Sequence, residues 1–464
     1  MISPYSTIDE LGRALRTRQA SSVELTGMYL DRLKSLGNDH RAVAELTEEL
    51  AMTQARAADQ RHAKGLARGP LDGIPFGVKD LLATKGIPTR WGSPGHSDQV
   101  FDFDATAVKR LQDAGGVLVA KLAMIELAGG GNYNIPGASA TGACLSAFDK
   151  NLWAGGSSSG SGAATALGCV GYSLGSETSG SITCPSAFNG CSGFRPTYGR
   201  VSRHGGMALC WTLDKIGPMA RSARDCGTVL QAIAGHDAND PSSLRAKLNL
   251  EKSRDRKKLR IGLLKEAFTQ NKAEACEKAY DEAVKVFRRL GYEVVEVAYP
   301  QLPYGPAVGI IVDAEGASSF ENYIRGPRFQ ELADINQVAG FTAALQTKAI
   351  DYLWAMRMRV EALKANAIWE KCDVVFTPVF YHKAVSATLP FDQTWRNMGG
   401  DGGPANLLGW PSLAFPIGFE DGAPLGGQAI AACIREDLCY RVATDFQRET
   451  DFHLRRPVSI GKPG

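Results

Sequence analysis

The stretch Gly171-Tyr-Ser-Leu-Gly-Ser-Glu-Thr-Ser-Gly-Ser-Ile-Thr-Cys184 contains four serines, at positions 173, 176, 179 and 181. Ser173 lies in a G-x-S-x-G pattern, which is typical of the nucleophile elbow of α/β-hydrolases. That elbow requires a strand before the serine and a helix directly after it. Here residues 166–174 indicate a helix end followed by a buried strand, and the Ser-Glu-Thr-Ser-Gly-Ser that follows is a poor helix start. The context therefore favours a strand leading into a site, and it disfavours Ser173 as a nucleophile.

A second glycine-serine tract, GGSSSGSGAATALG at 155–168, precedes the first. Such tracts are often flexible linkers, but this one runs directly into the helix-forming residues 163–167. A phosphate-binding turn is the other alternative, although neither G-K-[ST] nor a full G-x-G-x-x-G is present. Residues 156–160 also match G-x-S-x-G, so this pattern arises easily in the chain. We predict a glycine-rich turn that opens a helix.

A candidate base lies further toward the N-terminus, in Leu71-Asp-Gly-Ile-Pro-Phe-Gly-Val-Lys-Asp80. The chain has only seven histidines, and none lies in a stretch that resembles a Ser-His-Asp triad. A serine hydrolase can use a lysine base instead. Lys79 ends an apolar strand, although a single lysine there is more often a surface residue than a base.

The composition restricts the class of protein. The 464 residues are 44% hydrophobic and 22% charged with a net charge of +3, which is typical of a globular protein and gives no attraction to nucleic acid or anionic membranes. No signal-peptide h-region or 18-residue apolar span occurs, so we expect a cytoplasmic protein without membrane contact. The ten scattered cysteines form no C-x-x-C pair, and we expect neither a metal nor a cofactor. The expected partner is a small-molecule substrate, and the chain is expected to be a monomer or homodimer.

Four regions follow one another along the chain. Residues 1–65 are predicted as a helical region packed on the core, with capping boxes at Thr7/Glu10 and Ser21/Glu24. Residues 66–235 are predicted as an α/β catalytic core, including a helix over 104–115 and a strand at 117–120. The polar residues 236–258 resemble an exposed linker.

Residues 259–464 are predicted to complete the same α/β fold. Strands are expected at 259–264 and 292–297, with a helix over 273–290 between them. A further helix is expected over 339–372, and its apolar positions fall roughly on one face: Leu345, Ile350, Leu353, Met356 and Leu363. Trp354 and the pair Met356/Met358 are predicted as core residues.

Together, three blocks resemble the amidase signature family in the family's own order. GIPFGVKD (73–80) resembles its lysine motif, GGSSSGSGAA (155–164) resembles its glycine-serine turn, and 176–202 resembles its nucleophile block. Weaker similarities extend from Ser22 to Gln428. The resemblance implies an α/β/α sandwich with a large central mixed, twisted sheet covered by helices. It also implies a variable substrate rim at 307–393.

The family triad, carried over by motif, implies three catalytic residues. These are Lys79 as base, Ser157 in a cis peptide as proton relay, and the nucleophile Ser181, which follows Ser157 by the expected 24 positions. The resemblance leaves Ser176 as a structural residue. Oxyanion stabilisation is expected from the backbone N–H groups of Thr178, Ser179, Gly180 and Ser181. Trp91, Met124 and Tyr133 are hypothesised to line an apolar or aromatic substrate pocket.

Some positions depart from the family pattern. Glu177 stands where aspartate is common, Ser179 where glycine is common, and Thr183 and Cys184 where an arginine often follows the nucleophile. The missing arginine favours a neutral substrate. We expect an amidohydrolase that cleaves the C–N bond of a carboxamide, and that could also accept carbamates or esters.

Three alternatives to this function remain. The first is the glutaminase subunit of a tRNA-dependent amidotransferase, and the second is a catalytically silent binding module. The third is an α/β-hydrolase-type esterase that uses Ser173.

Overall fold

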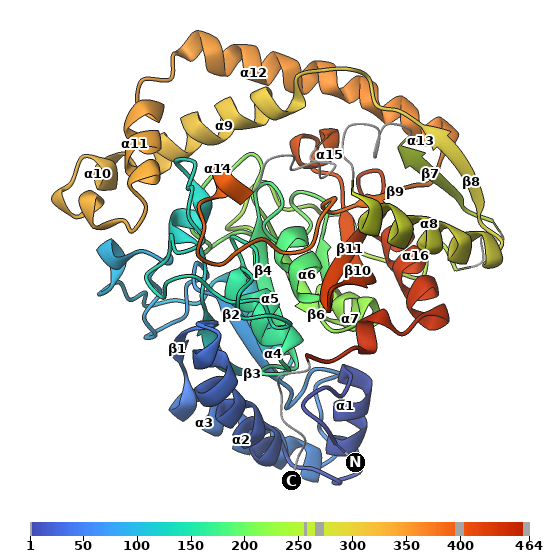
Figure 1. Cartoon of the computed structure of the whole chain (residues 1–464). Helices are drawn as coiled ribbons and strands as arrows, with labels where there is room; N and C mark the ends of the chain where they lie inside the picture. The colour runs from blue at the N-terminus through green and yellow to red at the C-terminus, as the bar shows by residue number, and fades with distance from the viewer. Residues whose placement is uncertain (1, 255–257, 265–272, 395–402, 458–464) are drawn as a thin grey trace.

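One mixed sheet runs through the protein (Figure 1). The computed structural model describes residues 2–254, 258–264, 273–394 and 403–457. In these residues the sheet has eleven strands in the order β1-β3-β2-β4-β6-β5-β10-β11-β9-β7-β8. The strands are β1 (Val43–Leu46), β2 (Pro75–Lys79), β3 (Val117–Leu122), β4 (Tyr172–Glu177), β5 (Ser192–Arg195), β6 (Lys215–Ala220), β7 (Arg260–Leu264), β8 (Glu293–Val297), β9 (Val374–Pro378), β10 (Ser412–Glu420) and β11 (Ala423–Ile430).

The strand directions confirm the predicted mixed sheet. β2 pairs in parallel with β3 and β4, and β7 pairs in parallel with β8 and β9. The pairs from β4 through β6, β5, β10 and β11 to β9 are antiparallel, as is β1 with β3. Because β2 and β4 are parallel neighbours, Lys79 and Glu177 end their strands at the same edge of the sheet.

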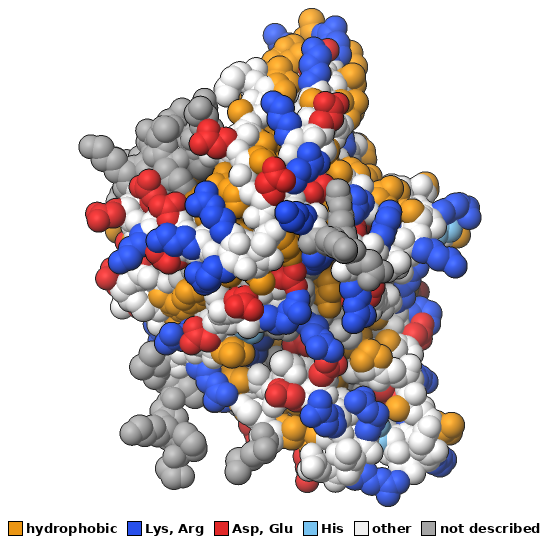
Figure 2. All heavy atoms as spheres, turned by 90° about the vertical axis from the view of Figure 1, so that its right-hand side faces the viewer, with side chains coloured by type: hydrophobic (Ala, Val, Ile, Leu, Met, Phe, Trp, Pro, Cys, Tyr) orange, Lys and Arg blue, Asp and Glu red, His pale blue; other side chains and the backbone are white. Residues whose placement is uncertain are grey.

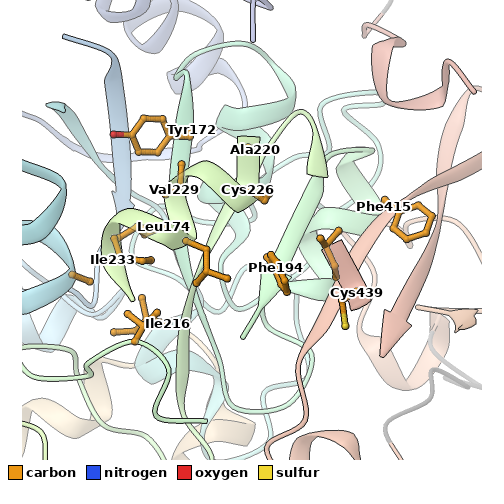
Figure 3. Packing of buried hydrophobic residues seen from close by; sticks show 14 of the residues in the cluster. Tyr172, Leu174, Phe194, Ile216, Ala220, Cys226, Val229, Ile233, Phe415 and Cys439 are labelled. Carbon is orange, nitrogen blue, oxygen red and sulfur yellow. The ribbon is translucent and has the colours of Figure 1, made fainter. Parts of the chain in front are cut away.

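Helices cover both faces of this sheet. On β5, a side chain at Gly193 would collide with Ser186 of α6, whereas the adjacent Phe194 packs in the cluster formed with α7 and α16. Since neighbouring strand residues point to opposite faces, α6 lies on one face and α7 and α16 lie on the other. Figure 3 shows the second face, where side chains of β4 and β5 meet those of α7 and α16. Helices that contact the sheet include α5 (Ser159–Ala166), α6 (Thr183–Asn189), α7 (Ala223–Ile233), α8 (Glu274–Arg289) and α16 (Glu436–Glu449), and α4 (Thr106–Asp113) packs on α7.

The N-terminal region contains a strand as well as helices. Its helices are α1 (Ile8–Arg16), α2 (Ser22–Arg32) and α3 (Glu48–Ala63), and both predicted capping boxes are present. The prediction of helices alone is wrong at β1, which pairs antiparallel with β3. The segment 43–46 is short and only partly buried, so its sequence shows no clear alternation of apolar and polar residues. It adopts a strand because it pairs with β3 of the core.

An outer helical arm follows β8. It comprises α9 (Tyr304–Ser319), α10 (Glu321–Ile324), α11 (Ile335–Ala344), α12 (Ala349–Ala362) and α13 (Ile368–Lys371), with the short α14 (Phe391–Thr394) and α15 (Pro404–Leu407) later in the chain. Figure 1 shows α9 and α12 side by side, away from the sheet. The predicted single helix over 339–372 is therefore broken into α11, α12 and α13.

The predicted apolar face at 345–363 is only partly covered. Ile350, Leu353 and Leu363 are 66%, 58% and 52% exposed. Only the side of α12 that faces α9 is covered, and there Trp354 and the two methionines pack against the core as predicted. A helix covered on one side buries one stripe only, and the sequence shows two apolar stripes.

The polar segment 236–258 contains no helix or strand in its described residues 236–254 and 258. It is largely exposed, but Asp240, Ser243, Leu250 and Ser253 are buried, so it follows the surface of the core. Figure 2 shows basic and acidic side chains interspersed on one face, in keeping with the small net charge. No helix in the described ranges combines the length and apolar character needed to span a membrane.

Candidate active site

Lys79 lies fully buried at the end of β2. Its Nζ donates to Ser157 Oγ at 2.7 Å and to Ser176 Oγ at 3.0 Å. Burial lowers the pKa of Lys79 to about 7, against the opposing influence of the Asp214 and Glu177 carboxylates. A lysine that releases its proton near neutral pH can act as a general base.

Ser157 lies against Lys79 in the glycine-rich turn, and the preceding Gly155 lies so close to α6 that a Cβ there would meet Pro185. The peptide bond Gly156–Ser157 is cis, as predicted, and Ser157 O accepts the N–H of Ile125 at 3.1 Å. The next residue, Ser158, donates its N–H to the carbonyl of Ser181 at 3.3 Å, so the two serine segments are adjacent. Ser181 is 8% exposed, and its hydroxyl has no hydrogen-bond partner within the described part of the chain. The three triad candidates are thus brought together by β2, the glycine-rich turn and the loop after β4.

The loop at 178–181 presents a row of backbone donors. Among the described residues, the N–H groups of Thr178, Ser179, Gly180 and Ser181 donate to no protein acceptor. Gly180 has φ +87°, and a Cβ there would meet nothing within 4 Å, so the space beside it is open. Ser179 is exposed and makes no hydrogen bond within the described ranges. The hydroxymethyl group that a glycine would lack therefore does not constrain the conformation of the loop. Unpaired N–H groups beside an open space can bind a developing oxyanion.

The buried carboxylate of Glu177 holds the residues that follow this loop in place. Its Oε2 accepts the N–H groups of Ile182 at 2.9 Å and Thr183 at 3.0 Å, and its Oε1 accepts Arg195 at 2.6 Å. Burial alone would raise the pKa of Glu177, but Arg195 and Lys215 together lower it to about 2. The N–H groups that follow Ser181 are thereby satisfied, in contrast to the four before them.

The other serines of the opening stretch have different surroundings. Ser173 is fully buried in β4, where its hydroxyl donates to Ser161 O at 3.1 Å and lies 2.9 Å from Thr165 Oγ1. It is a strand residue, as predicted, and no helix follows it directly. Ser176 differs from the prediction, because its contact with Lys79 makes it part of the site. The parallel pairing of β2 with β4 creates this contact, and no local motif indicates it.

None of the three hypothesised pocket residues lines the cavity that reaches Ser176 and Thr178. Trp91 packs against His96, Phe101 and Phe320, with ring centroids 4.7 to 6.3 Å apart. Met124 is fully buried beside a separate cavity of about 220 Å³. Tyr133 is nearer to the nucleophile segment, since it packs edge-on against Trp153 and Phe391 and lies close enough to Cys184 for that thiol to influence its pKa.

A half-open cavity of about 190 Å³ lies against the site, and the sequence reasoning missed it. Ser176 and Thr178 are buried residues of its lining, and Arg203 and Trp211 are more exposed. The remaining lining is mainly apolar: Leu81, Ala128, Met207, Ala208, Leu209 and Ile216. Residues 203–216 supply most of it, and their only signal in the sequence is the weak family similarity at 214–218.

Known proteins resemble this chain over most of its length. A model of the Amidase family matches residues 24–440. The chain is 36% identical over 490 residues to the A subunit of the glutamyl-tRNA(Gln) amidotransferase of Methylococcus capsulatus, with 98% of this chain and 99% of that protein covered. The corresponding protein of Chloroflexus aggregans is 34% identical, with 98% of each chain covered. The native peptide amidase of Stenotrophomonas maltophilia superposes with a TM-score of 0.86 at 28% identity, covering 98% of this chain and 99% of that one. The chain therefore belongs to the amidase signature family.

Proposed function

We propose that the protein hydrolyses the C–N bond of a carboxamide through an acyl-enzyme on Ser181. One observation carries this proposal: buried Lys79 is hydrogen-bonded at 2.7 Å to Ser157, whose cis segment adjoins Ser181 and its row of unpaired N–H groups. A serine hydroxyl needs a base to become an effective nucleophile, and the pKa of Lys79, lowered to about 7 by burial, suits that task.

In the acylation step the Ser181 proton passes to Ser157 Oγ while the Ser157 proton passes to Lys79 Nζ. Ser181 Oγ bonds to the carbonyl carbon, and the N–H groups of 178–181 donate hydrogen bonds that stabilise the negative charge on the carbonyl oxygen. When the tetrahedral intermediate collapses, the C–N bond breaks. Ser157 then protonates the leaving nitrogen and regains a proton from Lys79.

Deacylation repeats these steps with water in place of Ser181. The relay removes a proton from the water, the hydroxide oxygen attacks the acyl carbon, and Ser181 Oγ leaves and regains its proton. The carboxylic acid is released. Because the groups act only on a carbonyl and a leaving group, esters and carbamates suit the same steps.

Of the two candidate substrates, the better supported is glutamine, which the chain would hydrolyse as the glutaminase subunit of a tRNA-dependent amidotransferase. The relatives named as the A subunit of such an enzyme match the chain over nearly its whole length at 34 to 36% identity. Because those relatives are named as one subunit of a larger enzyme, this assignment requires that the chain act together with other subunits.

A second candidate is a small neutral substrate with an apolar or aromatic group. The mainly apolar cavity beside Thr178 favours it, as does the absence of an arginine at Thr183 and Cys184. The structural similarity to a peptide amidase is compatible with it.

Turnover of a substrate panel tests the proposal. Glutamine, an aliphatic amide, an aryl amide, an aryl ester and a carbamate are supplied to wild type, Ser181→Ala and Ser173→Ala. We expect amide turnover in wild type and Ser173→Ala only, with glutamine preferred if the amidotransferase assignment holds and the aryl amide preferred if the second candidate holds. Amide turnover that survives Ser181→Ala would overturn the mechanism.

A further inference from the structure

Glu315 is a buried carboxylate in the outer helix α9, far in sequence from the triad. It is 1% exposed and forms no ion pair with any described residue. Its oxygens instead accept four hydrogen bonds, from Thr212 N at 3.1 Å, Thr212 Oγ1 at 2.8 Å, Cys210 Sγ at 3.1 Å and Tyr352 Oη at 3.0 Å. A buried carboxylate is tolerated only when its oxygens are satisfied, so these four donors are fixed in place.

Three of those donors belong to the loop that also holds Asp214. The Asp214 carboxylate accepts the N–H groups of Leu209 and Cys210, both at 2.9 Å. Its other oxygen accepts the hydroxyl of Thr178 at 2.5 Å. Asp214 is partly buried in the lining of the cavity that reaches Thr178. The loop from 209 to 214 is thus held at one end by α9 and at the other by the first residue of the oxyanion loop.

Thr178 is held from a second direction as well. The Nζ of buried Lys215 donates to Thr178 O at 3.2 Å and also to Leu213 O. Both the side chain and the carbonyl of Thr178 are therefore bonded to residues 213–215, which fixes the plane of the following peptide and the direction of the Ser179 N–H. Displacement of that segment would turn an oxyanion donor away from its target.

We infer that Glu315 is a positioning residue, which sets the oxyanion donors at 178 and 179 through Thr212, Cys210 and Asp214. The inference rests on the proposed function, because it assigns those donors to the tetrahedral intermediate. It adds a role for the outer helices, since Tyr352 of α12 shares the same carboxylate and Arg359 of α12 donates to Thr212 O at 3.1 Å. The outer arm and the catalytic loop form one hydrogen-bonded unit.

Glu315→Gln tests this inference. The amide of glutamine keeps only one acceptor oxygen. The donors that bond to the replaced oxygen, which are two of the four, therefore lose their acceptor. Outright removal of an oxyanion donor lowers kcat by about 10²–10³-fold, so we expect misplacement to lower kcat by roughly 10–100-fold with KM within about twofold. The affinity for a boronic acid that forms a tetrahedral adduct with the nucleophile should fall by the same factor as kcat/KM, because both depend on the oxyanion donors.

Two further variants make the test decisive. Glu321→Gln carries the same chemical change in the adjacent α10, at an exposed residue paired with Arg325, and should leave kcat unchanged. Thr212→Val removes one donor and leaves the buried carboxylate, so it should give a smaller decrease of the same kind; it decides the question if Glu315→Gln does not fold.

All measurements are made well below each variant's melting temperature. A lower melting temperature with unchanged kcat and boronate affinity would overturn the inference, as would a rise in KM alone. Failure of the proposed function is distinguishable, because it would appear as activity that survives Ser181→Ala in an otherwise unchanged protein.

Discussion

Replacement of Lys79 by methionine should stabilise the protein while it abolishes activity. Burial lowers the lysine pKa from 10.5 to about 7, and each unit corresponds to about 1.4 kcal/mol. In the unfolded chain the lysine stays protonated up to pH 10.5, whereas the folded protein loses that proton above pH 7. Lys79 therefore costs about 4 kcal/mol of folding free energy at pH 7 and about 2 kcal/mol at pH 9, and the stability of wild type rises with pH across this window.

Equilibrium urea denaturation of wild type and Lys79→Met at pH 7, 8 and 9 measures this effect. Loss of the hydrogen bonds to Ser157 and Ser176 adds a constant, so the decisive quantity is the change with pH. The stability advantage of the variant should shrink by about 2 kcal/mol from pH 7 to pH 9. Lys109→Met, at an exposed lysine of α4, controls for the loss of one positive charge. A difference between Lys79→Met and wild type that stays constant with pH would refute the assignment of Lys79 as a base poised near neutrality.

Two further predictions concern activity. The kcat/KM of wild type should rise with pH around a midpoint near 7. Asp214→Asn should move that midpoint to lower pH, because the Asp214 carboxylate raises the pKa of Lys79 in wild type. A midpoint that moves upward or stays in place in the variant would contradict this electrostatic effect of Asp214. Ser176→Ala should lower kcat by about 10-fold by removing one of the two hydrogen bonds that orient Lys79, whereas Ser173→Ala should stay within about twofold of wild type. Steady-state kinetics of the two alanine variants compare them directly, and equal effects would show that Ser176 has only a strand role.

The triad candidates could be named from sequence only through the resemblance to the amidase signature family, because each lies in a short motif that the family shares. Lys79 ends an apolar strand, the glycine-rich turn opens α5, and Gly180 has the positive φ that favours glycine. These local features survive without knowledge of the tertiary fold. The two capping boxes at the N-terminus were predictable for the same reason.

Other parts of the site depend on contacts between distant segments. The bond from Lys79 to Ser176 exists because β2 pairs with β4, and Glu315 reaches Thr212 across 103 residues. Hydrophobic periodicity likewise could not show which stripe of α12 faces α9, and Ile350 of the predicted apolar face is exposed. Register and helix orientation are set by the assembled fold, and no local pattern encodes them.

The central claim, an acyl-enzyme on Ser181, is tested most directly by mass spectrometry of protein quenched in acid during turnover of an aryl ester. Peptide fragmentation should place one acyl group on Ser181, and Ser181→Ala should carry none. An acyl group on Ser173 or Ser176, or one that persists on the Ser181→Ala protein, would contradict the account.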